Sequence, residues 1–173
     1  MTVSEAIKTR RSIRKFKADS VVTDDQIHKL LEAAMLAPSA CNSRPWEFVV
    51  VQNREKLDEL KEAHPYAKML STASAAIVIC ALPEVQEGIQ GGIAEGYFQQ
   101  DCGAATENIL LQAIELGLAT CWCGVYPKDY LIERVKTILD ISTLPFNLIA
   151  IGVPDEMPKS RGHFDENKVR YVK

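Results

Sequence analysis

The sequence predicts an α+β domain in which a small sheet lies between helical layers. Roughly four segments have the composition of strands and roughly five or six have helical periodicity. These segments are interleaved irregularly, without the regular βαβ alternation of a Rossmann or flavodoxin-like sheet. Residues 75–82 form a continuous apolar run, which is typical of a strand buried on both faces.

The chain has 173 residues, of which 47% are apolar and 25% are charged, with a net charge of -3. This length fits one domain over residues 1–173 and allows a sizeable core. The charge gives no reason to expect binding to nucleic acid or to a membrane surface. No apolar run approaches the roughly 18 residues of a membrane span, and the first residues lack the apolar region of a signal peptide.

Cysteine usage indicates a reducing cytosol, because five cysteines at irregular spacing do not form a secreted disulfide framework. Cys80 and Cys102 lie in apolar or helical patterns, so we expect buried thiols. Cys121 and Cys123 could bind a metal, but the second pair of a zinc site is missing. We therefore predict no metal.

The first element is a short helix, because Thr2 and Glu5 form a capping box. We expect it to turn Val3, Ala6 and Ile7 inward. Residues 10–17 follow.

Residues 10–17 hold five cations, which could simply form a solvated face. Strand-like alternation would place Arg10, Ser12 and Arg14 on one side and Arg11 on the other. Two guanidinium groups and a hydroxyl on one side suit a phosphate, because arginine binds its oxygens bidentately. The segment is a candidate phosphate site.

A second helix starts at the capping box of Thr23 and Gln26 and ends near Met35. The loop 37–46 comes next and is bracketed by two prolines. Proline restricts its own φ and the residue before it, so this loop is stiff. It either connects helix to strand or presents polar groups to a ligand.

Trp46–Val51 has strand composition, and Asn53 can cap the helix that follows. The sequence His64-Pro65 ends that helix, and we expect His64 at the surface. The glycine-rich residues 84–96 match no phosphate-loop pattern, which favours a surface loop or lid.

Residues 97–118 form the longest predicted helix, and apolar side chains cover most of its circumference. Such a helix lies at the centre of a domain or in a subunit interface. Residues 121–127 read as a strand edge and a turn, residues 130–139 as a helix and residues 146–153 as a buried strand. The tail 158–165 is polar and basic.

No Ser-His-Asp, Cys-His or paired-carboxylate constellation is evident, so an enzyme of this sequence would rely on a cofactor. The cations of residues 10–17 and of Lys159 and Arg161 could converge on one anionic group. The amides of the 37–46 loop could form hydrogen bonds with a planar polar ring.

The sequence resembles the FMN-dependent nitroreductases over nearly its whole length, and it resembles their short members. Five motifs carry the resemblance in family order. They are Arg10-Arg11-Ser12-Ile13-Arg14-Lys15-Phe16; Ala37-Pro38-Ser39-Ala40-Cys41-Asn42-Ser43-Arg44-Pro45-Trp46; Asp101-x-x-Ala104-Ala105-x-x-Asn108 with Leu116-Gly117-Leu118; Cys121-Trp122; and Ile149-Ala150-Ile151-Gly152-x-Pro154 with Arg161-x-x-Phe164-Asp165.

The resemblance implies a nitroreductase-like fold with a mainly antiparallel sheet, and a homodimer with FMN at the interface. The 97–118 helix would form that interface, and the C-terminal tail would wrap the partner. Three groups of residues would contact FMN: Arg10, Arg11, Ser12, Arg14, Lys159 and Arg161 at the phosphate and ribityl chain; Pro38, Ser39, Asn42 and Arg44 at the flavin, often from the partner subunit; and the backbone of Cys121, Cys123 and Gly124 near N5 of the ring.

Two positions depart from the family pattern. Arg44 stands where many members have glutamine, and a cation there would favour the anionic reduced flavin. Cys123 lies where the family usually has no thiol. Its side chain either serves packing or is a redox-sensitive group beside the flavin.

The implied activity is ping-pong hydride transfer from NAD(P)H through flavin N5 to a nitroaromatic, quinone or flavin, without an obligatory side-chain acid or base. One alternative is a specialised flavin reaction such as reductive dehalogenation. Another is a flavin-binding or thiol-redox module without turnover.

Overall fold

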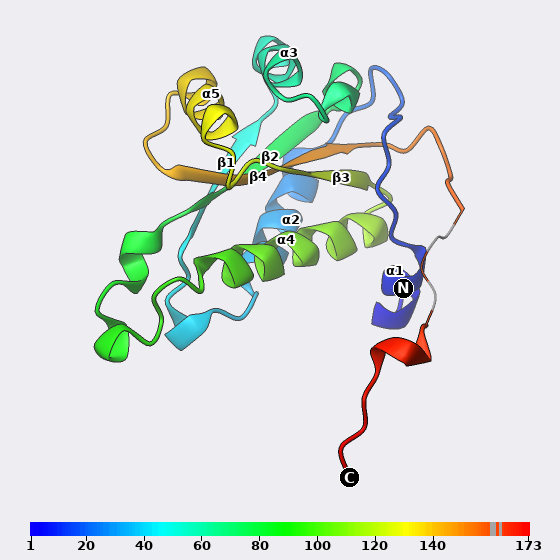
Figure 1. Cartoon of the computed structure of the whole chain (residues 1–173). Coiled ribbons are helices and arrows are strands. Elements are labelled where there is room, and N and C mark those ends of the chain that lie inside the picture. Colours follow the sequence, from blue (N-terminus) through cyan, green and yellow to red (C-terminus); the bar gives the residue numbers. More distant parts are fainter. Residues whose placement is uncertain (160–161, 163) are drawn as a thin grey trace.

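A computed structural model describes residues 1–159, 162 and 164–173. One antiparallel sheet has the strand order β1-β2-β4-β3, with helices on both faces (Figure 1). The predicted α+β class is confirmed. The elements are α1 (Val3–Thr9), α2 (Asp24–Met35), η1 (Ala40–Asn42), β1 (Trp46–Val51), α3 (Arg54–Ala63), η2 (Lys68–Ser71), β2 (Ala75–Ala81), η3 (Pro83–Gln86), η4 (Ile89–Gly92), α4 (Phe98–Glu115), β3 (Ala119–Gly124), α5 (Asp129–Leu139), β4 (Leu144–Gly152) and η5 (Glu166–Lys168).

Two hydrophobic layers pack against the sheet. Every residue of β2 is buried, as its apolar run predicts. Because side chains alternate along a strand, Ile77 and Ile79 pack with α2 and α4, whereas Val78 and Cys80 pack with α3 and α5. The two central strands are therefore covered on both faces, and β1 and β3 form the edges.

The long helix α4 ends at Glu115, three residues before the predicted end at Leu118. Gly117 has φ of 70°, a left-handed conformation that glycine adopts readily. The Leu118 N–H then donates to the Ala113 carbonyl at 2.8 Å, as in a Schellman cap. Leu118 is buried although it lies outside the helix, which explains why the apolar pattern runs past the helix end.

Helix α1 has the predicted capping box, but only Ala6 is buried. The exposed fractions of Val3 and Ile7 are 72% and 58%, so the prediction that both point inward is wrong within this chain. Leu36, just after α2, is 82% exposed. These side chains leave apolar surface uncovered on α1 and α2.

Residues 10–17 lie along the outer edge of β3. The Ile13 N–H donates to the Thr120 carbonyl at 3.0 Å, and Phe16 bridges to Pro154 just after β4. Ile13 and Phe16 are buried. The segment is thus an extra, irregular strand whose apolar residues hold its cations at the edge of the sheet.

Gly152 lets Phe16 approach the end of β4. A Cβ atom at this position would lie 2.9 Å from the Phe16 ring, closer than van der Waals contact allows. We expect Gly152→Ala to lower the free energy of unfolding by about 1–3 kcal/mol, because the buried ring must move. Urea unfolding measures this. Gly103→Ala is the control: its Cβ would meet its nearest atom, in Trp122, at 3.9 Å, and we expect no loss. Equal stability of both variants would contradict the packing argument.

Candidate functional site

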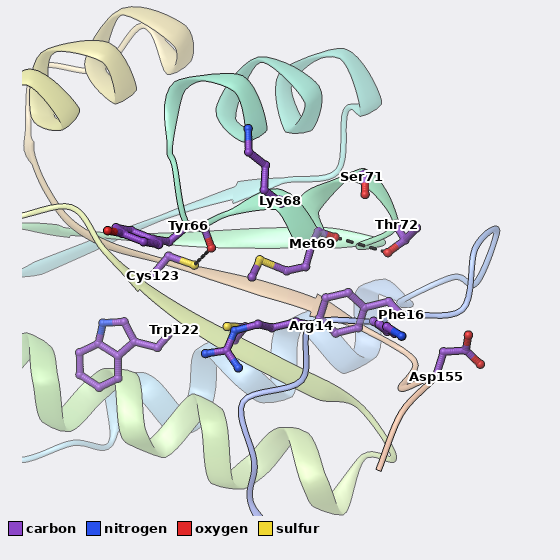
Figure 2. Close-up of a pocket in the computed structure, with 12 residues that line it drawn as sticks. Arg14, Phe16, Tyr66, Lys68, Met69, Ser71, Thr72, Trp122, Cys123 and Asp155 are labelled. Carbon is purple, nitrogen blue, oxygen red and sulfur yellow. Dashed lines mark hydrogen bonds between the residues drawn. The ribbon is translucent and has the colours of Figure 1, made fainter. Parts of the chain in front are cut away.

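A cleft of about 710 Å³ opens beside the outer edge of β3 (Figure 2). Arg14 comes from the N-terminal segment, Tyr66 and Lys68 from the region after α3, and Trp122 and Cys123 from β3. Cationic, aromatic and sulfur side chains therefore line a space of the size that ligand sites commonly have. Among these residues, Tyr66, Lys68 and Trp122 were not predicted.

β3 is an edge strand, and its outward backbone is only partly paired among the described residues. Alternate residues of a strand direct their N–H and C=O groups to the same side. Thr120 uses its outward carbonyl to accept from Ile13, and Gly124 uses its own to bond His64 at 2.8 Å. Trp122 lies between them with the same parity, so its backbone polar groups face outward too. Cys121 and Cys123 direct theirs into the pairing with β4.

His64 is 2% exposed, so the prediction that it lies at the surface is wrong. Its ring lies beside the end of β3, where Nε2 forms a hydrogen bond with the Gly124 carbonyl. Its Nδ1 accepts a hydrogen bond from the Tyr66 N–H at 3.1 Å. The sequence offered no sign of this, because Gly124 is distant in the chain and both partners are backbone groups.

The arginines of residues 10–17 have different partners and surroundings. Arg10 pairs with Glu107 of α4 at 3.5 Å. Arg11 donates to the Arg10 carbonyl, while its own Nε is buried without a partner among the described residues. Arg14 is exposed and lines the cleft. Arg11 lines a different pocket, with Ile13 and Thr120. An anionic group in the cleft would therefore meet the charge of Arg14.

The start of the C-terminal tail is tied to the same segment. The Glu156 carboxylate accepts from the backbone N–H groups of Arg14 and Lys15 at 2.6 and 3.2 Å, and the Asp155 N–H donates to the Lys15 carbonyl. Lys159 follows three residues later and is exposed. These bonds hold the start of the tail beside the N-terminal segment. Arg161 lies outside the described residues.

The loop between the two prolines is held in an unusual conformation. Cys41, Asn42 and Arg44 have φ values of 51°, 52° and 51°, a left-handed region that costs non-glycine residues energy. The Arg44 N–H donates to Ser39 Oγ at 2.9 Å, and Arg44 Nε donates to Asn42 Oδ1 at 3.3 Å. Ser39, Asn42 and Arg44 are therefore connected to one another.

Buried polar groups anchor this loop to the body of the protein. Both oxygens of Asp101, in the first turn of α4, accept from the Ala40 N–H at 3.2 Å. Gln86 is fully buried and donates to Asp101 at 2.7 Å and to Ser43 at 3.1 Å. The glycine-rich segment predicted as a loop or lid is thus fastened to the proline loop through Gln86.

The predicted site residues form two separate groups. Pro38, Ser39, Asn42 and Arg44 precede β1, at one edge of the sheet, whereas Arg14, Cys121, Cys123 and Gly124 lie at β3, the opposite edge. Three interstrand spacings separate these edges, or about 14 Å. The structure brings each group together but does not join the two groups within one chain.

Cys121 and Cys123 point to the same face of β3 and line the cleft. The hydrogen bond from Cys123 and the charge of Arg14 lower the pKa of Cys121 to about 7, although burial opposes the shift. The bond to Cys121 and burial raise the pKa of Cys123, whose single S–H can instead donate to the Tyr66 carbonyl at 3.5 Å. Burial raises the pKa of Cys80 to about 11 and of Cys102 to about 12. As predicted, these two are buried thiols.

This difference predicts selective alkylation in a Cys41→Ser background, which removes the exposed thiol. Iodoacetamide should modify Cys121 with a rate that reaches half its maximum near pH 7, because a lowered pKa makes the thiolate available there. Mass spectrometry identifies the site. Replacing Cys123 with alanine, which removes the donor, should move the midpoint up, toward about 9. A midpoint that already lies at 9 with Cys123 present would contradict the proposed hydrogen bond.

Taken together, the β3 edge offers features that fit FMN. The charge of Arg14 suits a phosphate, and the cleft beside the outward backbone of Trp122 can receive a planar ring. Lys68 adds a cation to the cleft, and no sequence signal distinguished it from other surface lysines.

Comparison with known proteins identifies the family. The Nitroreductase family profile matches residues 7–64 and 61–153. A relative from Methanothermobacter thermautotrophicus, provisionally named NADH dehydrogenase/NAD(P)H nitroreductase, is 42% identical over all of this chain and 88% of its own length. An FMN-dependent nitroreductase from Clostridium difficile R20291 superposes with a TM-score of 0.83 at 33% identity, over 97% of this chain and 98% of that one. A provisionally named nitroreductase from Desulfovibrio desulfuricans, solved in complex with FMN, gives a TM-score of 0.82 at 26% identity, over 100% and 98%. The chain belongs to the Nitroreductase family.

Proposed function

We propose that residues 1–173 form one FMN-binding domain of an NAD(P)H-dependent oxidoreductase that reduces nitroaromatics, quinones or flavins. The observation that carries the proposal is the cleft at the β3 edge, which Arg14 and Lys68 line beside the outward backbone of Trp122. The names of the relatives from M. thermautotrophicus and C. difficile support the reaction class and the cofactor.

The residues at this edge would divide the binding of FMN between them. Arg10, Ser12 and Arg14 would hold the phosphate and ribityl chain, with Arg11 beside them and Lys159 and Arg161 approaching from the tail. The Trp122 and Gly124 backbone would hold the polar edge of the ring, while Cys121 and Cys123 flank it. FMN, when bound, supplies the hydride chemistry. The protein therefore needs to bind, orient and shield the ring rather than donate a proton.

The two-group geometry supports a homodimer in which the proline loop of one chain completes the site of the other. Pro38, Ser39, Asn42 and Arg44 lie across the sheet from the cleft of their own chain. Exposed Val3, Ile7 and Leu36 provide apolar surface for a partner. The C-terminal end projects away from the helices and sheet (Figure 1), and Phe164 and Tyr171 on it are 73% and 78% exposed. We expect this tail to wrap the partner subunit.

Reconstitution with FMN tests the cofactor and the site. We expect the protein to bind FMN and to oxidise NADH or NADPH in the presence of a quinone or nitrofuran. Arg14→Gln should weaken FMN binding about tenfold or more, because it removes a charge-assisted bond. Lys56→Gln, an exposed change on α3, should leave affinity unchanged. A protein that cannot take up FMN would disprove the proposal. Binding without turnover by any acceptor would favour a non-catalytic flavin module instead.

Arg44 gives a separate prediction about the reduction potential of bound FMN. Its side chain is exposed and carries a positive charge at the tip of the proline loop. If that charge faces the ring from the partner subunit, Arg44→Gln should lower the two-electron potential by on the order of 10–30 mV. Redox titration against a reference dye measures this, with Lys56→Gln as the matched charge control. An unchanged or higher potential in Arg44→Gln would contradict the role.

A further inference from the structure

His64 is a buried histidine whose two ring nitrogens are both engaged. Nε2 lies 2.8 Å from the Gly124 carbonyl, and Nδ1 lies 3.1 Å from the Tyr66 backbone nitrogen. A carbonyl can only accept and a backbone N–H can only donate, so a single neutral tautomer, with the proton on Nε2, satisfies both partners. The ring therefore acts as a directional link between two backbone segments.

The first segment is the end of the β3 edge. Two hydrogen bonds pin this outward edge among the described residues: Ile13 to Thr120 at one end, and His64 to Gly124 at the other. The backbone of Trp122 lies between these two points. His64 thus determines how far the stretch of backbone beside the cleft can twist or lift away from β4.

The second segment is the turn that leads from α3 to the opposite wall of the cleft. The Tyr66 N–H donates to His64, and the Tyr66 carbonyl accepts from Cys123 Sγ at 3.5 Å (Figure 2). Tyr66 itself is 79% exposed, and Lys68 and Met69 follow it along the cleft. Three hydrogen bonds and the peptide bond between Cys123 and Gly124 therefore connect His64, Tyr66, Cys123 and Gly124 in a ring.

We propose that His64 is a positioning residue: it holds the free edge of β3 and the turn around Tyr66 at a fixed separation, and so sets the geometry of the cleft. It does not line the cleft and touches no ligand there. The inference rests on the proposed function insofar as the ligand is FMN. A planar ring that bonds one strand edge depends on the position of that edge, and small displacements weaken such contacts.

Two substitutions separate the bonds. In His64→Gln the side-chain Nε2 can reach the Gly124 carbonyl, but the acceptor for Tyr66 is lost. In His64→Asn the Oδ1 atom can accept from Tyr66, but the bond to Gly124 is lost. His64→Leu removes both. His28→Asn is the control, because the His28 side chain is 72% exposed and, among the described residues, pairs with Glu32 on the same helix.

We expect His64→Asn and His64→Leu, which both lose the bond that pins Gly124 at the β3 edge, to bind FMN about tenfold more weakly than the unchanged protein. His64→Gln keeps that bond, so its affinity should remain within about threefold. The visible spectrum of bound FMN should shift in His64→Asn, and His28→Asn should match the unchanged protein. Affinity and spectrum are measured well below the melting temperature of each variant. If melting temperatures fall but affinity and spectrum do not change, His64 is only a core histidine and the proposal is wrong.

Hydrogen–deuterium exchange of the protein without FMN tests the same role independently of the cofactor. Amides of residues 119–126 should exchange about tenfold faster in His64→Asn than in His28→Asn, because the end of the edge is no longer pinned. Unchanged exchange would overturn the proposal even if FMN binds normally. Faster exchange in a protein that does not bind FMN would support the positioning role and disprove the proposed function.

Discussion

Burial of the two central strands on both faces is the constraint on which the rest of the structure depends. β2 is buried at every position, and β4 is buried from Asn147 to its end. Helices cover both faces, so neither face can hold a polar site. Chemistry is thereby confined to the two edges. The edge at β3 carries the cleft, and the edge at β1 begins with the strained proline loop.

Edge backbone is usually a liability, because its unpaired groups invite association with other strands. This protein covers part of the β3 edge with residues 10–17 and part with His64, and it leaves the stretch around Trp122 between them. The same covering segment delivers Arg10, Ser12 and Arg14. Packing of Ile13 and Phe16 therefore stabilises the sheet and positions the cations at once. The Glu156 carboxylate adds the start of the tail to this arrangement.

The proline loop follows a different physical logic. Left-handed φ values at Cys41, Asn42 and Arg44 cost energy, and the hydrogen bonds from Ala40 and Gln86 to the buried Asp101 offset that cost. The loop is rigid without being part of the cleft of its own chain. Rigid polar loops that lie far from any site of their own chain are well suited to complete a site on a second subunit.

The sequence by itself determined the type and order of nearly all elements, because capping boxes, proline breaks and apolar runs act over a few residues. It also identified the cations and the proline loop as candidate ligand-binding residues, through motifs that are local in the chain. It could not show that Val3 and Ile7 stay exposed or that His64 is buried, because burial depends on which distant elements pack against a residue. Nor could it single out Trp122 and Lys68. Only the tertiary structure decided these points: which backbone groups remain free depends on strand pairing, and which side chains share a cleft depends on packing between segments that are remote in sequence.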